Sequence, residues 1–206
     1  MELKSDLIIL RDFIPSDIEE RIKWETDENE WQLWDAPWDY EGKEKEELLK
    51  DLERYKNKMQ IWAKEKKGEN DLRSSFQICI NDSTKKYIGW CGSYNINEKF
   101  QITPAKDRCA IGIDIPAMTA RGKGYAASAL VLFIQYLIRH GINEIYTQTW
   151  SGNKRMVSLA NKIGFEQCMC KSKIRSVRGE LYDDLTFRLN RKKFYEFTGA
   201  EQQADL

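Results

Sequence analysis

The chain has 206 residues, which is enough for one domain with a sizeable buried core. Its 33 lysine and arginine residues balance its 33 aspartate and glutamate residues, so the composition argues against a protein that binds duplex nucleic acid through many phosphates. No run of about eighteen apolar residues occurs, so we expect no membrane-spanning segment. The five cysteines lack metal-ligand spacing, so we expect reduced thiols in a cytoplasmic protein without a bound metal.

The first predicted elements are a short strand and a helix. Residues 7–11 are apolar up to a final arginine and favour a β-strand. Ser16 is followed three residues later by Glu19, which is the spacing of a capping box. A helix is therefore predicted to begin at Ser16 and to run to about Glu25.

Residues 24–40 concentrate large aromatic side chains among carboxylates. Their spacing follows neither the helical nor the strand period, and Pro37 interrupts any helix. Two interpretations stay open. The aromatic side chains either pack this segment on the core, or form with the carboxylates a wall that binds an amine cation. Under the second interpretation the candidate substrate-binding residues are Trp31, Trp34, Asp35 and Trp38.

A long helix and three strands are expected next. Residues 44–66 repeat apolar side chains at helical spacing. Strands are predicted at residues 75–80, 86–94 and 108–115, with turn and loop residues between them. The expected buried stripe of the helix consists of Leu48, Leu52, Tyr55, Met59 and Trp62.

Residues 111–129 carry the most informative pattern. A β-branched run ends at Pro116, and residues 121–126 then place two glycines ahead of a helix that is predicted to extend to about residue 139. Glycine lets a ligand approach the backbone, and the first N–H groups of a helix have no intrahelical acceptor. A strand, a glycine-rich turn and a helix N-terminus together predict a pyrophosphate site.

The C-terminal part alternates strand and helix before a final hairpin. A strand is predicted at residues 145–150 and a short helix at about 153–163. Residues 165–173 and 181–189 are expected to pair through a turn at residues 177–180.

Two cofactors fit the predicted pyrophosphate site. Residues 122–127 satisfy the dinucleotide pattern G-x-G-x-x-G/A, which also requires an acidic residue at the end of the next strand. That strand ends in Thr149 and Trp150, and Glu144 lies at its opposite end. A nicotinamide-dependent oxidoreductase is therefore disfavoured, and coenzyme A is the better candidate.

The sequence resembles the GNAT acetyltransferases. Residues 121–126 match their pyrophosphate-loop pattern Q/R-x-x-G-x-G/A, and Asn153 with residues 159–165 resembles the N-x(5–8)-A-x-K-x-G-F region of the RimJ/RimL-like branch. The resemblance implies an α+β fold with a mixed, mostly antiparallel twisted sheet of six to seven strands flanked by about four helices. It also implies a single domain over residues 1–198 with a polar tail at 199–206, and acetyl-CoA as co-substrate.

The resemblance also implies which residues hold acetyl-CoA. The N–H groups of residues 122–126 would bind the pyrophosphate, with positive charge from Arg121 and Lys123. Backbone groups of residues 113–115 would bind the pantetheine arm, and Asn153 matches an asparagine that bonds the pantetheine or the acceptor side. The expected cofactor-binding residues are Ile113, Ile115, Arg121, Gly122, Lys123, Gly124, Tyr125, Ala126 and Asn153.

The acid and the base are less clearly marked. No tyrosine lies between Thr147 and Asn161, where many GNAT enzymes have their proton donor, and Met156 occupies the position where the RimL-like pattern often has serine. Ser151 and Ser158 lie nearby, and Ser151 is the candidate acid. Asp114 is the candidate base, because it is a charged residue in an apolar strand that faces either solvent or the acceptor channel.

The function predicted from these residues is N-acetyl transfer. Acetyl-CoA would donate its acetyl group to a primary amine, which attacks directly in a ternary complex. The acceptor would be a protein N-terminus or a small cationic amine. A non-catalytic acyl-CoA-binding sensor is the alternative. The expected partners are acetyl-CoA and the amine, without nucleic acid or membrane, and a homodimer is the candidate assembly.

Overall fold

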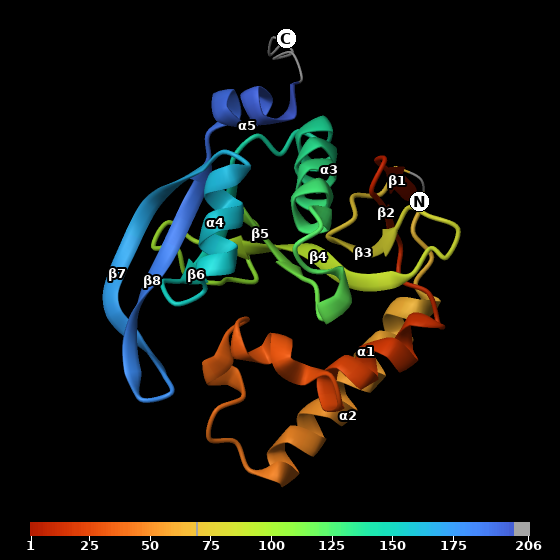
Figure 1. Ribbon diagram of the computed structural model, residues 1–206, viewed down its shortest axis with the longest axis vertical. Helices are drawn as coiled ribbons and strands as arrows, with labels where there is room; N and C mark the ends of the chain where they lie inside the picture. The colour runs from red at the N-terminus through yellow and green to blue at the C-terminus, as the bar shows by residue number, and fades with distance from the viewer. Residues whose placement is uncertain (69, 200–206) are drawn as a thin grey trace. The chain divides into compact units, whose positions relative to one another are not determined.

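A computed structural model describes residues 1–68 and 70–199, as strands β1–β8, helices α1–α5 and three 3₁₀ turns η1–η3 (Figure 1). The strands form one sheet in the order β1-β2-β3-β4-β5-β6-β8-β7. In chain order the elements are β1 Glu2–Lys4, β2 Ile8–Arg11, α1 Asp17–Thr26, η1 Asn29–Leu33, η2 Pro37–Asp39, α2 Lys45–Lys64, β3 Ser75–Ile80, β4 Tyr87–Ile96, β5 Arg108–Asp114, η3 Met118–Ala120, α3 Tyr125–Arg139, β6 Ile145–Trp150, α4 Lys154–Lys162, β7 Phe165–Val177, β8 Glu180–Leu189 and α5 Arg191–Thr198.

The sheet confirms the mixed, mostly antiparallel fold expected from the sequence. β5 and β6 pair in parallel, whereas β1–β2, β2–β3, β6–β8 and β7–β8 are antiparallel. The described residues hold eight strands and five α-helices, more than the six to seven strands and four helices expected. The additions include β1, a polar strand of three residues, and α5, a helix of only eight residues, and such short segments give a weak periodic signal.

The chain divides into two compact units. The first comprises Met1–Cys91 and Ile113–Ala129, and the second comprises Gly92–Gly112 with the described residues from Leu130 onward. The single domain expected over residues 1–198 stays a prediction, and residues 200–206 of the expected tail lie outside the described residues.

In the first unit, β2 and β3 are antiparallel, and Figure 1 shows α1 lying along α2. The start of α1 differs from the capping box expected at Ser16, whose side chain makes no capping hydrogen bond. The buried Asp17 carboxylate instead accepts the Ile14 N–H at 2.9 Å and two Arg11 N–H groups at 2.6 Å. The paired carboxylate of Asp17 therefore anchors the helix start.

The stripe predicted along α2 is buried at only one of its positions. Met59 is fully buried, whereas Leu48, near the start of the helix, is 39% exposed. Leu52, Tyr55 and Trp62 are half-buried. Helical periodicity located the inner face of α2 but not how much of that face is covered.

In the second unit, β5 and β6 pair with Ala110 opposite Tyr146, and the Thr147 hydroxyl donates to the Ile111 carbonyl at 2.8 Å. β7 and β8 form a long hairpin, clear in Figure 1, whose turn at Arg178 and Gly179 has positive φ at both positions. The hairpin turn predicted at residues 177–180 is confirmed.

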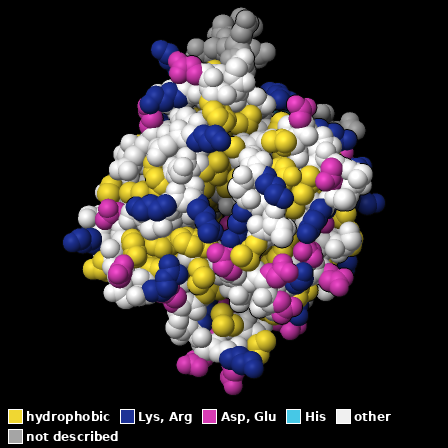
Figure 2. Space-filling model, viewed as in Figure 1, with side chains coloured by type: hydrophobic (Ala, Val, Ile, Leu, Met, Phe, Trp, Pro, Cys, Tyr) yellow, Lys and Arg dark blue, Asp and Glu magenta, His cyan; other side chains and the backbone are white. Residues whose placement is uncertain are grey.

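Figure 2 shows lysine and arginine side chains interspersed with aspartate and glutamate side chains over the visible face, in keeping with the balanced composition. None of the described helices is long and apolar enough to cross a membrane. Within residues 1–68 and 70–199, no three histidine, cysteine, aspartate or glutamate side chains are arranged to hold a metal ion.

Candidate active site

The glycine-rich loop before α3 has the backbone conformation that an anion site needs. Gly122 and Gly124 have φ of 75° and 84°, in the left-handed region that favours glycine. The Ser128 N–H donates to the Gly124 carbonyl at 3.0 Å as the first bond of the helix. None of the N–H groups of residues 122–127 donates to an acceptor in the described part of the chain. The loop therefore presents unpaired donors at a helix N-terminus.

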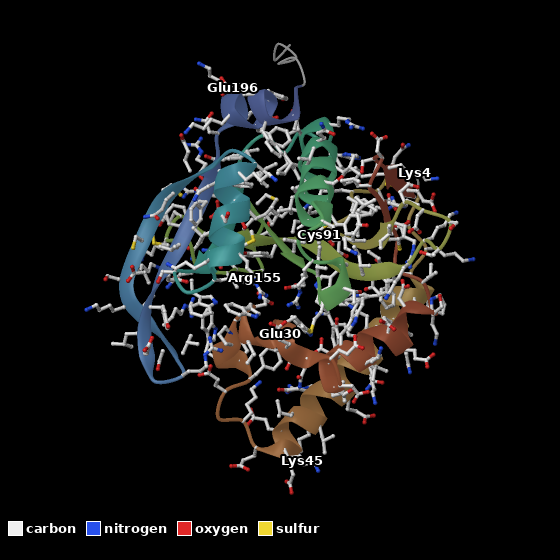
Figure 3. All side chains as sticks on the ribbon, viewed as in Figure 1. Lys4, Glu30, Lys45, Cys91, Arg155 and Glu196 are labelled. Carbon is white, nitrogen blue, oxygen red and sulfur yellow. The ribbon has the colours of Figure 1, made fainter. Side chains whose placement is uncertain are left out.

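Arg121 connects this loop to the acidic aromatic segment. Its guanidinium group forms an ion pair with Glu30, which is labelled in Figure 3, and donates to the Ile115 carbonyl at 2.9 Å. The other carboxylate oxygen of Glu30 accepts the Trp34 indole N–H at 2.7 Å. Arg121 thus holds η1 against the end of β5, and its expected contact with the pyrophosphate stays a prediction.

The other donor-site candidates of this unit differ in exposure. Lys123 is exposed beside the glycines, whereas Tyr125, Ala126 and Ile113 are half-buried. Ile115 follows β5 and already uses its carbonyl oxygen for the bond from Arg121. Lys123 is therefore the more accessible cation of the loop, because the guanidinium group of Arg121 is engaged.

Trp31 packs the aromatic segment on the core. Its side chain is 6% exposed, and its indole N–H donates to the Trp24 carbonyl at 2.8 Å. Its ring stands edge-on to Trp90 with centroids 5.2 Å apart. This geometry favours the packing interpretation for Trp31. Trp34 and Trp38 are half-buried and Asp35 is exposed, so these three keep surface that a ligand can reach.

Asp114 ends β5 among carboxyl groups from the N-terminal segment. Its side chain keeps some exposed surface, but burial raises its pKa well above the usual range, and the charges of Asp35 and Glu25 raise it further. The opposing influences are the positive charge of Arg21 and a hydrogen bond from Trp90. Asp114 is therefore half-buried and close to other charged groups, and does not lie at a fully solvent-exposed strand edge.

Two further carboxyl groups of the cluster titrate near neutrality. Burial raises the pKa of Glu25 to about 6, against the lowering influence of Arg21 and of the Gln32 amide, which donates to it at 3.0 Å. Burial and the nearby Asp39 raise the pKa of Asp35 to about 6. Asp35 also has exposed surface, so water reaches this residue.

Two tyrosines line the same cluster. Burial, followed by the negative charges of Glu25, Asp35 and Asp114, raises the pKa of Tyr40 above its usual range. Burial raises the pKa of Tyr55 to about 12, with Arg21 opposing the shift. Both phenols therefore stay protonated near neutral pH.

Arg21 is a buried charged residue beside the carboxyl cluster that the sequence did not single out. It is 4% exposed and lies on the buried face of α1 with Asp17 and Trp24. Its guanidinium carbon is 3.3 Å from the centroid of the Trp90 ring. The available signal was the spacing of two charged residues, Asp17 and Arg21, on the same helical face as a tryptophan.

A tight backbone contact fixes the place of Asp114 beside β4. A Cβ atom added at Gly89 would lie 2.1 Å from the Asp114 carbonyl oxygen and 2.9 Å from the Ile115 Cα. Only a glycine allows the two backbones to approach this closely. Gly89 therefore sets the distance between Trp90, the next residue, and Asp114.

Ser151 and Asn153 lie in the second unit, where both have structural hydrogen bonds. The Asn153 side chain accepts the Met156 N–H at 3.1 Å and so caps the N-terminus of α4. The Ser151 hydroxyl accepts the Asp183 N–H at 3.0 Å, and the Ser151 N–H donates to the Asp183 carbonyl at 2.9 Å. Their expected roles in catalysis and in coenzyme A binding stay predictions.

Comparison with known proteins identifies the family to which the chain belongs. Residues 8–166 match the family model of the acetyltransferase (GNAT) domain, so the chain belongs to that family. It is an acetyl-CoA-dependent N-acetyltransferase. No curated protein sequence matches it significantly.

Solved structures of low sequence identity share the fold. A GNAT-family acetyltransferase from Bacillus anthracis is 17% identical with a TM-score of 0.65, over 93% of this chain and 99% of that one. RimL, the ribosomal L7/L12 α-N-protein acetyltransferase, in complex with coenzyme A is 15% identical with a TM-score of 0.62, over 91% and 97%. Spermidine N-acetyltransferase from Vibrio cholerae, in complex with coenzyme A and spermine, is 17% identical with a TM-score of 0.59, over 91% and 97%.

Proposed function

We propose that this N-acetyltransferase moves the acetyl group of acetyl-CoA to the primary amine of a cationic acceptor, by direct attack in a ternary complex. The observation that carries the proposal is the cluster of Glu25, Asp35 and Asp114 around aromatic side chains, with Arg21 as the cation whose charge acts on both Glu25 and Asp114. Carboxylates and aromatic faces are the groups that attract an ammonium ion.

The acceptor is a protein N-terminus or a small cationic amine. RimL acts on a protein α-amine, and the Vibrio cholerae relative is a spermidine N-acetyltransferase. These two activities, together with the motif at Asn153 and residues 159–165, support a place in the RimJ/RimL-like branch. We also propose a cytoplasmic location, which the free thiols of Cys79 and Cys91 support.

The glycine loop holds the donor in this proposal. The N–H groups of Gly122, Lys123, Gly124, Tyr125 and Ala126 suit the pyrophosphate of coenzyme A, because they lack acceptors among the described residues and lie at a helix N-terminus. The charge of Lys123 adds to this attraction. Acetyl-CoA supplies the acetyl group, and the chain supplies orientation and proton transfer.

Asp114 acts as the general base. The acceptor arrives as an ammonium ion, and the Asp114 carboxylate takes one proton so that the nitrogen lone pair is free. The nitrogen then forms its bond to the thioester carbonyl carbon, the carbon–sulfur bond breaks, and the thiolate takes a proton lost by the nitrogen. One proton returns from Asp114 to solvent in each turnover. A base with a raised pKa suits this step, because proton transfer is most efficient near the working pH.

The test measures acetyl transfer to a panel of amines, with release of the coenzyme A thiol as the readout. The panel contains spermidine, amino acid amides and peptides with free N-termini, with N-acetylated peptides as blank acceptors. Thiol release with a cationic amine supports the proposal. Coenzyme A binding without thiol release for any amine would favour the sensor alternative.

A substitution separates the role of Asp114 from that of the fold. Asp114→Asn should lower kcat/KM about 10²- to 10⁴-fold, the usual contribution of a general base. Asp107→Asn, at an exposed position outside the cluster, is the matched control and should leave the rate unchanged. Equal rates for the two variants would remove Asp114 from the mechanism.

A thermal melt tests the donor. Coenzyme A at about 100 times its dissociation constant should stabilise the protein by about 2.7 kcal/mol, and NAD should have no effect. Stabilisation by NAD instead would overturn the assignment of the loop.

A further inference from the structure

Two neighbouring side chains anchor η1 to different parts of the first unit. The Trp31 indole N–H donates to the Trp24 carbonyl on α1 at 2.8 Å, and the Trp31 side chain is buried. The Glu30 carboxylate instead forms an ion pair with Arg121, which lies 91 positions further along the chain. All four residues belong to the first unit. η1 is therefore tied both to α1 and to the residue that opens the glycine loop.

Arg121 is a fixed partner for this ion pair. Its Nε donates to the Ile115 carbonyl at 2.9 Å, and its Nη2 donates to the Pro116 carbonyl at 3.3 Å. Its Nη1 donates to the Glu30 carboxylate. Because the guanidinium fork is rigid and planar, two bonds to backbone carbonyls set the direction in which its third side points. The backbone after β5 thus determines where Glu30 meets the loop.

The Glu30 carboxylate uses both of its oxygens. Oε2 accepts from Arg121, and Oε1 accepts the Trp34 indole N–H at 2.7 Å. Trp34 directly follows η1 and precedes the exposed Asp35, so this bond holds the first ring of the accessible part of the segment. A glutamine in place of Glu30 would lose the charge and one of the two acceptor oxygens, which breaks the bridge.

The chain after η1 is shaped by short-range backbone bonds. The Asp35 N–H donates to the Trp31 carbonyl at 3.1 Å, and the Asp39 N–H donates to the Ala36 carbonyl at 2.8 Å. Ala36 has φ of 45°, in the left-handed region that alanine seldom adopts, so its surroundings must hold this turn. Such turns set their own shape but not their place in the fold. The side-chain anchors at Trp31 and Glu30 help to fix that place.

We propose that Glu30 is a positioning residue for the acceptor: its bridge from Arg121 to Trp34 holds residues 34–39, which carry the candidate amine-binding side chains, beside the donor loop. The inference rests on the proposed function, in which carboxylates and aromatic faces attract the cationic acceptor. Glu30 does not touch the reacting atoms. It acts through the placement of Trp34 and Asp35.

The charge of Glu30 gives the positioning role a signature that general unfolding would not share. Coenzyme A binds as an anion, and a carboxylate paired with the first residue of the loop opposes that binding. Removing the charge should therefore leave the affinity for coenzyme A unchanged or increase it, while the acceptor binds less tightly. A general loss of structure would weaken the binding of both.

The experiment compares Glu30→Gln with the wild type in thiol release at saturating acetyl-CoA, with the amine of the panel that has the highest kcat/KM. The KM for the amine should rise about 5- to 30-fold, the scale of coupling between residues in contact. The kcat should change less than about twofold, because the lost interaction places side chains that bind the ground state and the transition state alike. The dissociation constant for coenzyme A, measured by calorimetry, should be unchanged or lower.

A second ion pair of the same segment provides the matched control. Glu28 pairs with Lys23 at 2.7 Å, and these side chains are 45% and 46% exposed. The side chains of Glu30 and Arg121 are 32% and 22% exposed. Exposed pairs contribute little, so Glu28→Gln should leave the KM for the amine unchanged. In an Arg121→Gln background, Glu30→Gln should change that KM by less than about twofold, because its partner is already absent.

The outcomes separate the positioning role from the proposed function. If the wild type releases thiol and Glu30→Gln has the amine KM of Glu28→Gln, the positioning role is wrong and the proposed function stands. An equal rise in the amine KM and in the coenzyme A dissociation constant would also overturn the positioning role. If the wild type releases no thiol with any amine, the proposed function fails and the inference fails with it. Should Arg121→Gln fail to fold, as judged by its circular dichroism spectrum, the comparison of Glu30→Gln with Glu28→Gln alone decides.

Discussion

The contact at Gly89 gives a sharp test of how the site is built. Replacing Gly89 by alanine places a methyl carbon 2.1 Å from the Asp114 carbonyl oxygen and 2.9 Å from the Ile115 Cα. Both are backbone atoms, so no side chain can rotate away to make room. The strand that carries Asp114 must shift, and the Asp114 carboxyl group should move with it.

The expected cost follows from overpacking. Extra atoms forced into a packed interior typically cost about 1–3 kcal/mol, and a clash with backbone lies at the upper end. For a protein of this size each kcal/mol lowers the melting temperature by about 2–4 °C, so Gly89→Ala should melt about 5–10 °C lower. A misplacement of the base by about 1 Å should also lower kcat up to about 10²-fold.

Gly112 is the matched control, because it is also a glycine in a strand. An added Cβ at Gly112 meets no atom within 4 Å. Gly112→Ala should therefore be neutral or slightly stabilising, since alanine restricts the unfolded chain. Thermal melts and thiol-release assays at a temperature where both variants are folded make the comparison. Equal stability and equal kcat for the two variants would refute the reasoning.

Three further predictions follow from the loop and the carboxyl cluster. Gly124→Ala forces alanine into φ near 84°, so the loop should relax into another conformation. The dissociation constant for coenzyme A, measured by calorimetry, should then rise about 5- to 30-fold, the equivalent of about 1–2 kcal/mol. An unchanged dissociation constant would contradict the role of the loop. Lys123→Gln should weaken coenzyme A binding without changing the melting temperature. Arg121→Gln should lower both the affinity for coenzyme A and the melting temperature, because Arg121 is paired with Glu30. Identical effects of the two substitutions would contradict the engagement of Arg121. Burial raises the pKa of Glu25 from 4.5 to about 6, so the folded state holds a proton that the unfolded state releases, and stability is lost as the pH rises through that window. Glu25→Gln should therefore gain stability relative to the wild type between pH 4.5 and 6 in urea titrations, and a pH-independent difference would be inconsistent with the raised pKa.

Local patterns in the sequence predicted most of the fold. β3 at Ser75–Ile80 and β6 at Ile145–Trp150 fall where the strand-forming runs were located, and α3 follows the glycine loop as its periodicity indicated. These elements depend on spacing and on residue type over a few positions. The resemblance at residues 121–126 and 159–165 supplied the sheet topology, which local pattern alone does not fix.

The sequence did not show which nearby group a side chain would bond. Ser16 has the sequence of a capping residue, yet the helix start is anchored by Asp17 and Arg11. Two interpretations were open for Trp31, and the hydrogen bond from its buried indole N–H to the Trp24 carbonyl favours packing. Each bond joins residues six or seven positions apart, and only the folded geometry shows which of the nearby groups meet.

The sequence by itself indicated the conformation of the glycine loop before α3, because positive φ at Gly122 and Gly124 and a helix N-terminus are properties of a short continuous segment. Only the tertiary structure showed which groups surround Asp114. Arg21, Trp90 and Asp114 come from α1, β4 and β5, and the sequence marked Asp114 as a candidate without showing its neighbours. A pKa raised by burial and a guanidinium group stacked on an indole exist only once these segments meet, because desolvation and charge–charge interactions depend on distance in space and not on separation along the chain.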